Sequence, residues 1–255
     1  MAGSVFQPYV SEAGVHFAGV YKCDIDGKVI NTALNMNIGD RFHANDLVCP
    51  ITNQHDTTTA VAEHRVLNAS YSKLAAAIAL KIKDIYVRPG AKVLYIADDT
   101  CGIELSHLSD IVGPDGRVYV VGQHEIIKSV DDEFGCLDKR SNISYIDATS
   151  YNPLAYKERI GEIDVIISDV DHIYQIESLA LNASTIMEEG NFIIFIKAHI
   201  AAHLSYLHNG AIVPSIAIYE PDMRNLEEHQ FDILHGITLE PYMESYGCIV
   251  GSYPS

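Results

Sequence analysis

The sequence is poor in basic residues: 17 lysines and arginines stand against 34 aspartates and glutamates, for a formal net charge of −17 at pH 7. A protein that holds nucleic acid through its own surface charge is normally basic. This composition argues against such binding, so any nucleic acid must be delivered by a partner or held by a local basic patch. A solubilising acidic surface is the simpler interpretation of the excess.

Other absences narrow the class of protein further. No apolar run is long enough to span a bilayer, and the N-terminus lacks the basic-then-apolar order of a signal peptide, so we expect an intracellular protein with no membrane partner. The five cysteines are scattered without a Cys-x-x-Cys motif, which predicts reduced thiols and no zinc site. Asp169-x-Asp171-His172 has no second cluster with ligand spacing, so we expect no metal.

The most informative segment is residues 92–122, KVLYIADDTCGIELSHLSDIVGPDGRVYVVG. It predicts a buried strand at 93–97, a helix at 103–112 and a second strand at 118–121, and it resembles the opening of a nucleotide-binding Rossmann sheet. The turn after the first strand normally carries glycines that let a ligand approach the backbone. Here the turn reads ADDTCG, with one glycine and two carboxylates, so a cofactor fold is combined with an unusual cofactor turn.

Strands and helices alternate in the rest of the chain. We predict further strands at 143–146, 163–168, 192–197, 236–240 and 247–252, and further helices at 125–138, 174–188 and 222–234. Such alternation predicts a mostly parallel sheet covered on both faces. The last two strands are joined by a connection too short for a parallel crossover, so they should form an antiparallel hairpin. A parallel sheet that ends in such a hairpin is typical of Rossmann-like methyltransferases and not of NAD dehydrogenases.

Two parts of the chain differ in pattern. Residues 1–65 contain short extended runs such as GVHFAGVYKC and KVINTALNM, which predict a small β-rich N-terminal subdomain. A helix is expected to begin near Ser70 or Ser72. The α/β pattern then predicts that residues 66–255 form the Rossmann-like methyltransferase domain.

Several blocks, in order, resemble the fibrillarin family: GVYKCDIDGKVIN, YSKLAAAI, KVLYIADDTCGIELSHLSDIVGPDGRVYVV, PLAYKERIGEIDVIISDV, ALNA, IIFIKA and LEPY. The resemblance covers roughly residues 14–253. It implies S-adenosylmethionine-dependent 2′-O-methylation of ribose in rRNA, directed by a box C/D-type guide RNA, with a role in rRNA processing. Methylation of a histone glutamine is a second activity that the family implies. The implied partners are the guide RNA, the target rRNA and scaffold proteins of the ribonucleoprotein, in the nucleus and nucleolus.

The family's Lys-Asp-Lys-His set corresponds to Lys73, Asp169, Lys197 and, in place of histidine, Tyr246. The resemblance implies a catalytic role, with Lys197 as proton acceptor, its pKa lowered by desolvation and by Lys73, and Asp169 orienting it beside the sulfonium. A structural Lys–Asp ion pair at the sheet edge is the alternative. A phenol with a pKa of about 10 donates and accepts hydrogen bonds but does not become cationic near neutral pH. Tyr246 is otherwise an ordinary hairpin tyrosine.

The resemblance also implies a set of cofactor-binding residues: Asp98, Asp99, Gly102, Asp147, Asp169 and Gln175. Gly102 would allow close approach at the helix start, and Asp147 would contact the adenine. One of Asp98 and Asp99 would replace the acidic residue that the family has at Gly122. Alternatively, these two acids simply suit the helix dipole, and Gln175 is a polar residue at a helix start.

The chain departs from the family at several of these places. We expect a diverged member without the glycine- and arginine-rich N-terminal region of the eukaryotic proteins, and with an altered cofactor turn and Tyr246 in the catalytic set. One alternative is therefore a catalytically impaired fibrillarin-like paralogue that acts as a binding or scaffold subunit. Another is methylation of a protein side chain or a small molecule, which would suit the acidic surface.

Overall fold

The computed structural model describes residues 6–10, 16–25, 28–36, 47–53, 56–97, 102–122, 137–198 and 216–254. The strands are β1 Phe6–Val10, β2 His16–Ile25, β3 Lys28–Leu34, β4 Val48–Asn53, β5 Asp56–Val66, β6 Lys92–Ala97, β7 Arg117–Gly122, β8 Ile143–Asp147, β9 Val165–Asp169, β10 Gly190–Lys197, β11 Asp232–Thr238 and β12 Tyr246–Tyr253. The helices are α1 Lys73–Ala79, α2 Gly102–Val112, α4 Lys157–Ile160, α5 Gln175–Ile186 and α7 Glu220–Glu228, with short 3₁₀ turns η1 Leu137–Lys139, η2 Pro153–Ala155 and η3 Ile216–Tyr219.

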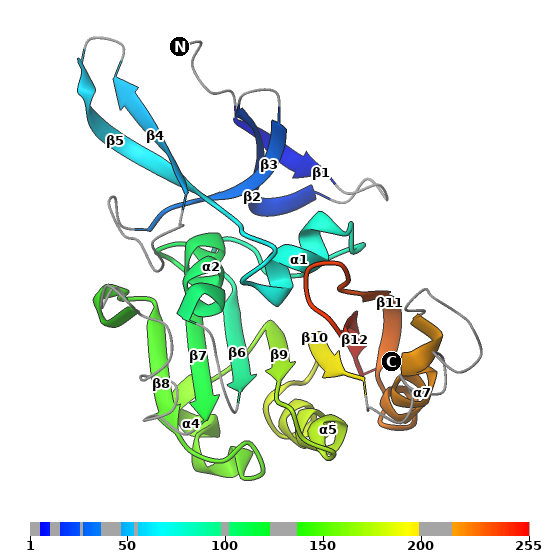
Figure 1. The fold of residues 1–255 in the computed structure, drawn as a ribbon. Helices are drawn as coiled ribbons and strands as arrows, with labels where there is room; N and C mark the ends of the chain where they lie inside the picture. The colour runs from blue at the N-terminus through cyan, green and yellow to red at the C-terminus, as the bar shows by residue number, and fades with distance from the viewer. Residues whose placement is uncertain are drawn as a thin grey trace.

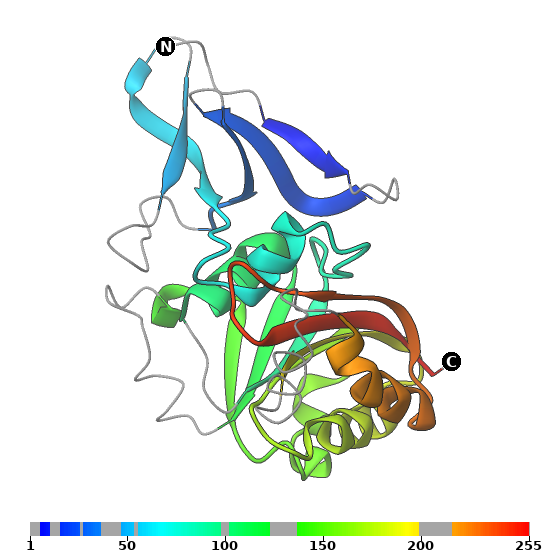
Figure 2. The ribbon, with the colours of Figure 1, turned by 45° about the vertical axis from the view of Figure 1, so that its right-hand side comes forward.

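The N-terminal strands form a sheet of their own. Within the described residues, β1 to β5 make a five-stranded antiparallel sheet in the order β1-β2-β3-β5-β4. This confirms the predicted β-rich character of the N-terminal part. In Figures 1 and 2 this sheet lies apart from the larger sheet, with α1 and α2 between the two. A domain boundary after residue 65 stays a prediction, since β5 itself continues to Val66.

The larger sheet is mostly parallel and ends in an antiparallel hairpin. Its described strands lie in the order β11-β12-β10-β9-β6-β7-β8. The pairs from β10 to β8 are parallel, whereas β12 is antiparallel to both β10 and β11. The predicted methyltransferase-type sheet and its closing hairpin are therefore confirmed.

Helices cover both faces of this sheet. Val93 and Tyr95 of β6 pack with α1, α2 and the N-terminal sheet in one core cluster. Leu94 and Ile96 of the same strand pack with α4, α5 and α7 in the second cluster on the opposite face. Because both faces of β6 are buried, polar and apolar residues do not alternate along this strand.

Two predicted helices differ from the structure. The helix predicted at 222–234 ends at Glu228, and Asp232 begins β11. Gln230 has a positive φ of 68°, which a right-handed helix does not accept, so the chain leaves the helix there. Of the helix predicted at 125–138, residues 123–136 lie outside the described residues, and Leu137 begins the short turn η1. The other elements predicted from residue 92 onward are confirmed, with shifts of a few residues at their ends.

A buried ionic network ties the N-terminal sheet to α2. Asp110 on α2 lies 3.4 Å from Arg65 Nε of β5 and 2.6 Å from Arg140 Nη1, and all of these side chains are fully buried. Arg140 also donates to Asn35 Oδ1, which lies just after β3. Two guanidinium groups and one carboxylate thus connect α2 to β5 and to the residue after η1. Among the described helices, none is long and apolar enough to cross a membrane.

Candidate active site

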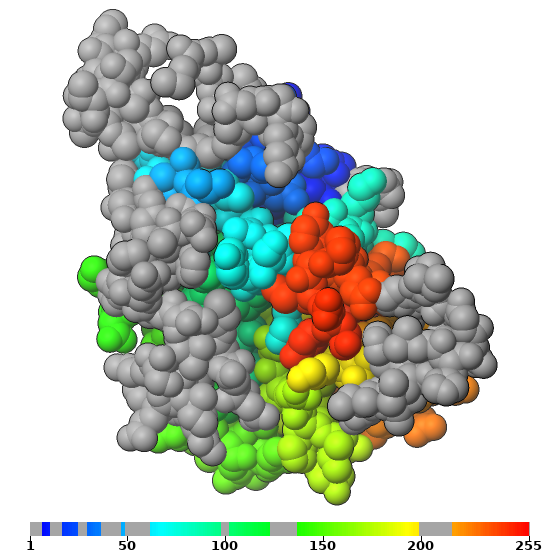
Figure 3. All heavy atoms as spheres, in the orientation of Figure 1, coloured from blue at the N-terminus to red at the C-terminus, as the bar shows by residue number. Residues whose placement is uncertain are grey.

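The carboxyl ends of the parallel strands meet at one edge of the larger sheet. Asp169 ends β9 beside the last residue of β6, and Asp147 ends β8 opposite Gly122 of β7. Lys197 ends β10 and pairs in register with Tyr246, the first residue of β12. Ligands of open parallel sheets bind at this edge. The space-filling view shows that the cyan region of α1, the yellow end of β10 and the red turn before β12 adjoin on one face (Figure 3).

Lys73 and Asp169 form the better buried ion pair of this edge. The Nζ atom of Lys73 lies 2.5 Å from Asp169 Oδ1, and the two side chains are 20% and 7% exposed. The second carboxylate oxygen accepts a hydrogen bond of 2.7 Å from the hydroxyl of Tyr95. Lys73 is placed there by α1, whose N-cap Ser72 accepts from the amide of Ala75. Both oxygens of Asp169 are therefore engaged.

Lys197 pairs with a different carboxylate. Its Nζ lies 2.6 Å from Asp171 Oδ2, and the side chains are 46% and 61% exposed. The expectation that Asp169 orients Lys197 is therefore wrong, because Asp169 contacts Lys73 and Tyr95. Asp169 is the last residue of β9, whereas Asp171 lies beyond the strand end, where its side chain reaches solvent.

Both ammonium groups lie close to the ring of Tyr246. Lys73 Nζ is 4.3 Å from the ring centroid, and Lys197 Nζ is 5.8 Å from it. A cation within about 6 Å of an aromatic face is attracted by the ring. The structure thus brings together Lys73, Asp169, Tyr246 and Lys197, the four side chains that the resemblance grouped.

Both lysines are held in the charged form. Burial alone would lower the pKa of Lys73, but the attraction of Asp169 and the hydrogen bond that Lys73 donates to it outweigh burial, and the pKa is raised above its usual 10.5. The hydrogen bond that Lys197 donates to Asp171, followed by the influence of Tyr246, raises the pKa of Lys197 as well. The expected lowering of the Lys197 pKa is wrong, since its side chain is too exposed for desolvation to compete with its partner.

Glu104 is a buried acid of this region that the sequence interpretation missed. It lies in the first turn of α2, is 3% exposed, and accepts a hydrogen bond of 3.1 Å from the backbone amide of Leu74. Burial and, after it, repulsion from Asp169 raise the pKa of its carboxyl from 4.5 to about 7. Its burial had one signal in the sequence, since Glu104 lies within a helix that was expected to pack against the sheet. Tyr95 was missed too, although a tyrosine inside an apolar strand needs a partner for its hydroxyl.

The expected cofactor-binding residues lie in different settings. Gly102 is the buried first residue of α2, and Asp147 is exposed at the end of β8. Gln175 begins α5, where its buried amide donates 3.0 Å to the carbonyl oxygen of Phe195 and 3.3 Å to that of Ser168. Its side chain therefore links β9 to β10. The remaining two expected residues, the neighbouring aspartates 98 and 99, lie outside the described residues.

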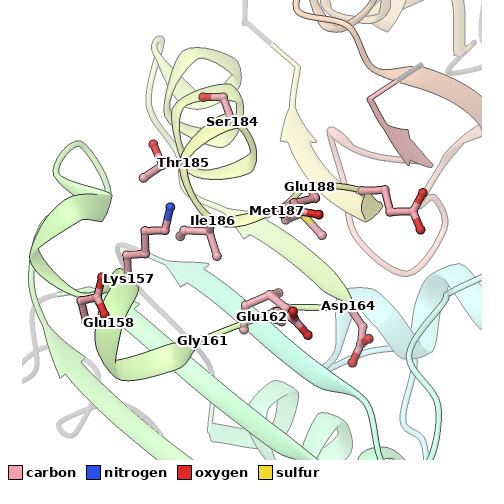
Figure 4. A pocket seen from close by; sticks show the side chains of 12 residues that line it. Lys157, Glu158, Gly161, Glu162, Asp164, Ser184, Thr185, Ile186, Met187 and Glu188 are labelled. Carbon is pink, nitrogen blue, oxygen red and sulfur yellow. The ribbon is translucent and has the colours of Figure 1, made fainter.

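A cavity of about 300 Å³ lies beside Lys197, between the start of α5 and α7. Its polar lining includes Asp171, His172 and Asp222. A larger hollow of about 700 Å³ lies where β9 and β10 begin, at the opposite end of the strands. Figure 4 shows that acids and Lys157 surround this second hollow. Its lining includes none of the residues gathered at the carboxyl edge, so the candidate active site is the edge with Lys73 and Lys197.

The described residues contain no group of three or more histidine, cysteine or acidic side chains placed to hold a metal ion. Two cysteines with described side chains, Cys23 and Cys248, are free thiols and buried.

Comparison with known proteins points to one family. The family model described as fibrillarin matches residues 12–255. The rRNA 2′-O-methyltransferase fibrillarin 2 of Arabidopsis thaliana is 37% identical over 204 residues, which are 80% of this chain and 59% of the relative. The rRNA 2′-O-methyltransferase fibrillarin of Rattus norvegicus is 35% identical over 192 residues, 75% of this chain and 55% of the relative. The chain thus spans about three fifths of the length of the curated relatives it matches.

Solved structures support the fold. A fibrillarin pre-rRNA processing protein of Methanococcus jannaschii aligns with a TM-score of 0.79 and 24% identity over 100% of both chains. An Aeropyrum pernix fibrillarin with natively bound S-adenosyl-L-methionine aligns with a TM-score of 0.77 and 24% identity, over 98% of this chain and 100% of that one. A chain of a fibrillarin/Nop5p complex aligns with a TM-score of 0.66 and 21% identity, over 91% and 96% of the two chains.

Proposed function

The chain belongs to the fibrillarin family, and we propose that it transfers a methyl group from S-adenosylmethionine to ribose 2′-hydroxyls of rRNA. The observation that carries the proposal is the convergence of Lys73, Asp169, Tyr246 and Lys197 at the carboxyl edge of a methyltransferase-type sheet. The curated relatives bear the name of this activity and are more than one-third identical.

The described residues at this edge suit the proposed cofactor. S-adenosylmethionine carries a sulfonium cation, an amino acid group and an adenosine, and it supplies the methyl group as an electrophile. Asp169 and Glu104 are carboxylates that would attract the sulfonium cation, and the exposed carboxylate of Asp147 would accept from adenosine donors. The amino end of α2 at Gly102 would receive the cofactor's own carboxylate.

We assign the two lysines to substrate binding as cations. Acting as a base requires loss of a proton, and the pKa of each lysine is raised by its partner. As cations, Lys73 and Lys197 would instead hold phosphate or ribose oxygens and align the hydroxyl with the methyl group. Tyr246, close to both ammonium groups, would contribute a hydroxyl and a ring face in place of the family's histidine.

The net charge of −17 bears on how RNA reaches this edge. We propose that a box C/D-type guide RNA and scaffold proteins present the target rRNA, in the nucleolus. A solved fibrillarin is in complex with Nop5p, which supports a protein partner of that kind. Delivery by such a particle would replace the basic surface that this chain lacks.

The test measures cofactor binding and turnover separately. Calorimetry should detect binding of S-adenosylmethionine to the purified protein, and a reconstituted guide–target RNA particle should receive methyl groups. Lys73→Ala should lower the transfer rate about 100-fold, whereas Lys157→Ala, a surface lysine at the opposite end of the strands, should leave it unchanged. Absence of both cofactor binding and transfer would refute the proposal.

Two other functions remain alternatives. A catalytically impaired paralogue that serves as a scaffold subunit is favoured by Gly122 and Tyr246, where the family resemblance implied an acid and a histidine. This alternative predicts that the protein enters the particle but does not bind S-adenosylmethionine. Methylation of a protein side chain, such as a histone glutamine, or of a small molecule would suit the acidic surface and predicts turnover without RNA.

A further inference from the structure

The amino end of α1 is held by a carboxylate from another helix. Glu104 of α2 accepts from the amide of Leu74 at 3.1 Å and also hydrogen-bonds the hydroxyl of Ser72. Ser72 in turn caps α1 by accepting from Ala75. These bonds flank Lys73 on both sides in the sequence, so the position of its side chain depends on Glu104.

Charged and titratable groups face Glu104 from three elements. Lys73 comes from α1, Asp169 from β9 and the thiol of Cys248 from β12. Burial, followed by Asp169, raises the pKa of Glu104 to about 7, against the opposing influence of Ser72, Leu74 and Lys73. Burial, followed by Glu104 and Asp169, raises the pKa of Cys248 well above its usual range, so the thiol stays neutral. The variable charge of this cluster therefore resides on Glu104.

We propose that Glu104 is a positioning residue that fixes Lys73 at the site and, by its charge, favours a cationic ligand over a neutral one. The inference rests on the proposed function, because the ligand pair is S-adenosylmethionine, a sulfonium cation, and S-adenosylhomocysteine, the neutral thioether that methyl transfer leaves. Lys73 and Asp169 neutralise each other at close range. The cluster is then neutral when Glu104 carries a proton and negative when it does not.

The sign of the pH effect follows from this charge. As the pH rises through neutrality, Glu104 loses its proton and the site attracts the sulfonium more strongly, while the thioether is unaffected by the charge. The ratio of the two affinities should therefore increase with pH, by about fivefold for a charge acting across a partly buried site. The effect would help the protein bind fresh cofactor and release product.

The first experiment measures the affinity of the full chain for both ligands by calorimetry, over about two pH units on each side of neutrality. The wild type should show the rising ratio. Glu104→Gln keeps an acceptor oxygen for Leu74 but does not ionise, and its ratio should be flat. Glu177→Gln, an exposed glutamate in the first turn of α5, should behave as the wild type. A flat wild-type ratio, or an equal slope in Glu104→Gln, would overturn the charge effect.

The second experiment needs no ligand, so it separates this inference from the proposed function. Hydrogen exchange of the Leu74 amide should accelerate in Glu104→Ala, which loses the acceptor, and stay slow in Glu104→Gln. Equal protection in all variants would overturn the positioning role. If exchange follows this pattern but neither ligand binds, the proposed function fails while the structural part of the inference stands.

Discussion

The two ion pairs near the Tyr246 ring provide a natural comparison. Lys73 and Asp169 of the first pair are 20% and 7% exposed, whereas Lys197 and Asp171 of the second are 46% and 61% exposed. Both pairs are lysine with aspartate at nearly the same distance, 2.5 and 2.6 Å. The difference therefore lies in the surroundings and not in the chemistry of the pair.

This difference should separate what the two pairs contribute. An exposed ion pair competes with water and salt and stabilises a protein by about 0–1 kcal/mol. A buried pair leaves an uncompensated charge when one partner is removed, which costs several kcal/mol. The buried Lys73–Asp169 pair should therefore contribute to folding and to the position of Lys73. The exposed Lys197–Asp171 pair should exchange its partner for a substrate more readily.

The largest expected effect comes from removing the buried carboxylate. Asp169→Asn removes the ion-pair partner of Lys73 and should lower the free energy of unfolding by about 3–4 kcal/mol. The matched change Asp171→Asn should cost less than about 1 kcal/mol. Urea unfolding at neutral pH measures both. Equal losses in the two variants would show that burial does not distinguish the pairs.

The second effect concerns Glu104, the buried acid of α2 that contacts the start of α1. Its pKa is about 7 in the folded protein against 4.5 ordinarily, so the folded state binds the proton more tightly. Stability should therefore fall as the pH rises from 4.5 to about 7 and level off above, a loss of about 3 kcal/mol from this group.

Thermal or urea unfolding across this pH range, compared between the wild type and Glu104→Gln, measures that contribution. Between pH 4.5 and about 7 the wild type should lose stability relative to Glu104→Gln, because only the wild type has a carboxyl that ionises at this position. A constant difference would mean that Glu104 keeps its ordinary pKa in the folded chain.

A smaller effect involves the ring itself. Lys73 lies nearer to the Tyr246 centroid than Lys197 does, 4.3 against 5.8 Å, and it is better shielded from water. A double-mutant cycle of Tyr246→Leu with Lys73→Met should give a coupling energy of about 1 kcal/mol. The same cycle with Lys197→Met should give a coupling close to zero. A larger coupling with Lys197 would reverse the proposed order.

Most of the fold could be predicted from the sequence because its signals are local. Apolar runs mark buried strands, and the short connection before Tyr246 permits only an antiparallel hairpin. The end of α7 was wrong because a single residue, Gln230, leaves the helical conformation within a stretch that otherwise suits a helix. Element ends of this kind depend on one backbone angle, which residue type predicts poorly.

The site was harder to predict because its contacts join distant residues. Lys73 and Asp169 are 96 positions apart, and the sequence interpretation paired Asp169 with Lys197 instead. Asp169 and Asp171 are two residues apart, yet only the first lies inside β9. Glu104 was not singled out in the sequence, and its contact with Leu74 of α1 joins residues 30 positions apart.

The smallest expected effect is on the titration of Lys197 itself. Its pKa is raised chiefly by the hydrogen bond to Asp171, so this pair adds stability below the ordinary pKa of 10.5 and loses it as the pH rises through the folded value. Asp171→Asn should lower the pKa of Lys197 toward its usual value and leave the pKa of Lys73 unchanged, because the exposed pair is screened by solvent. Side-chain NMR titration of both ammonium groups measures this, with Glu177→Gln as the control. If the pKa of Lys73 shifted together with that of Lys197, the two ion pairs would form one coupled network and would not contribute independently.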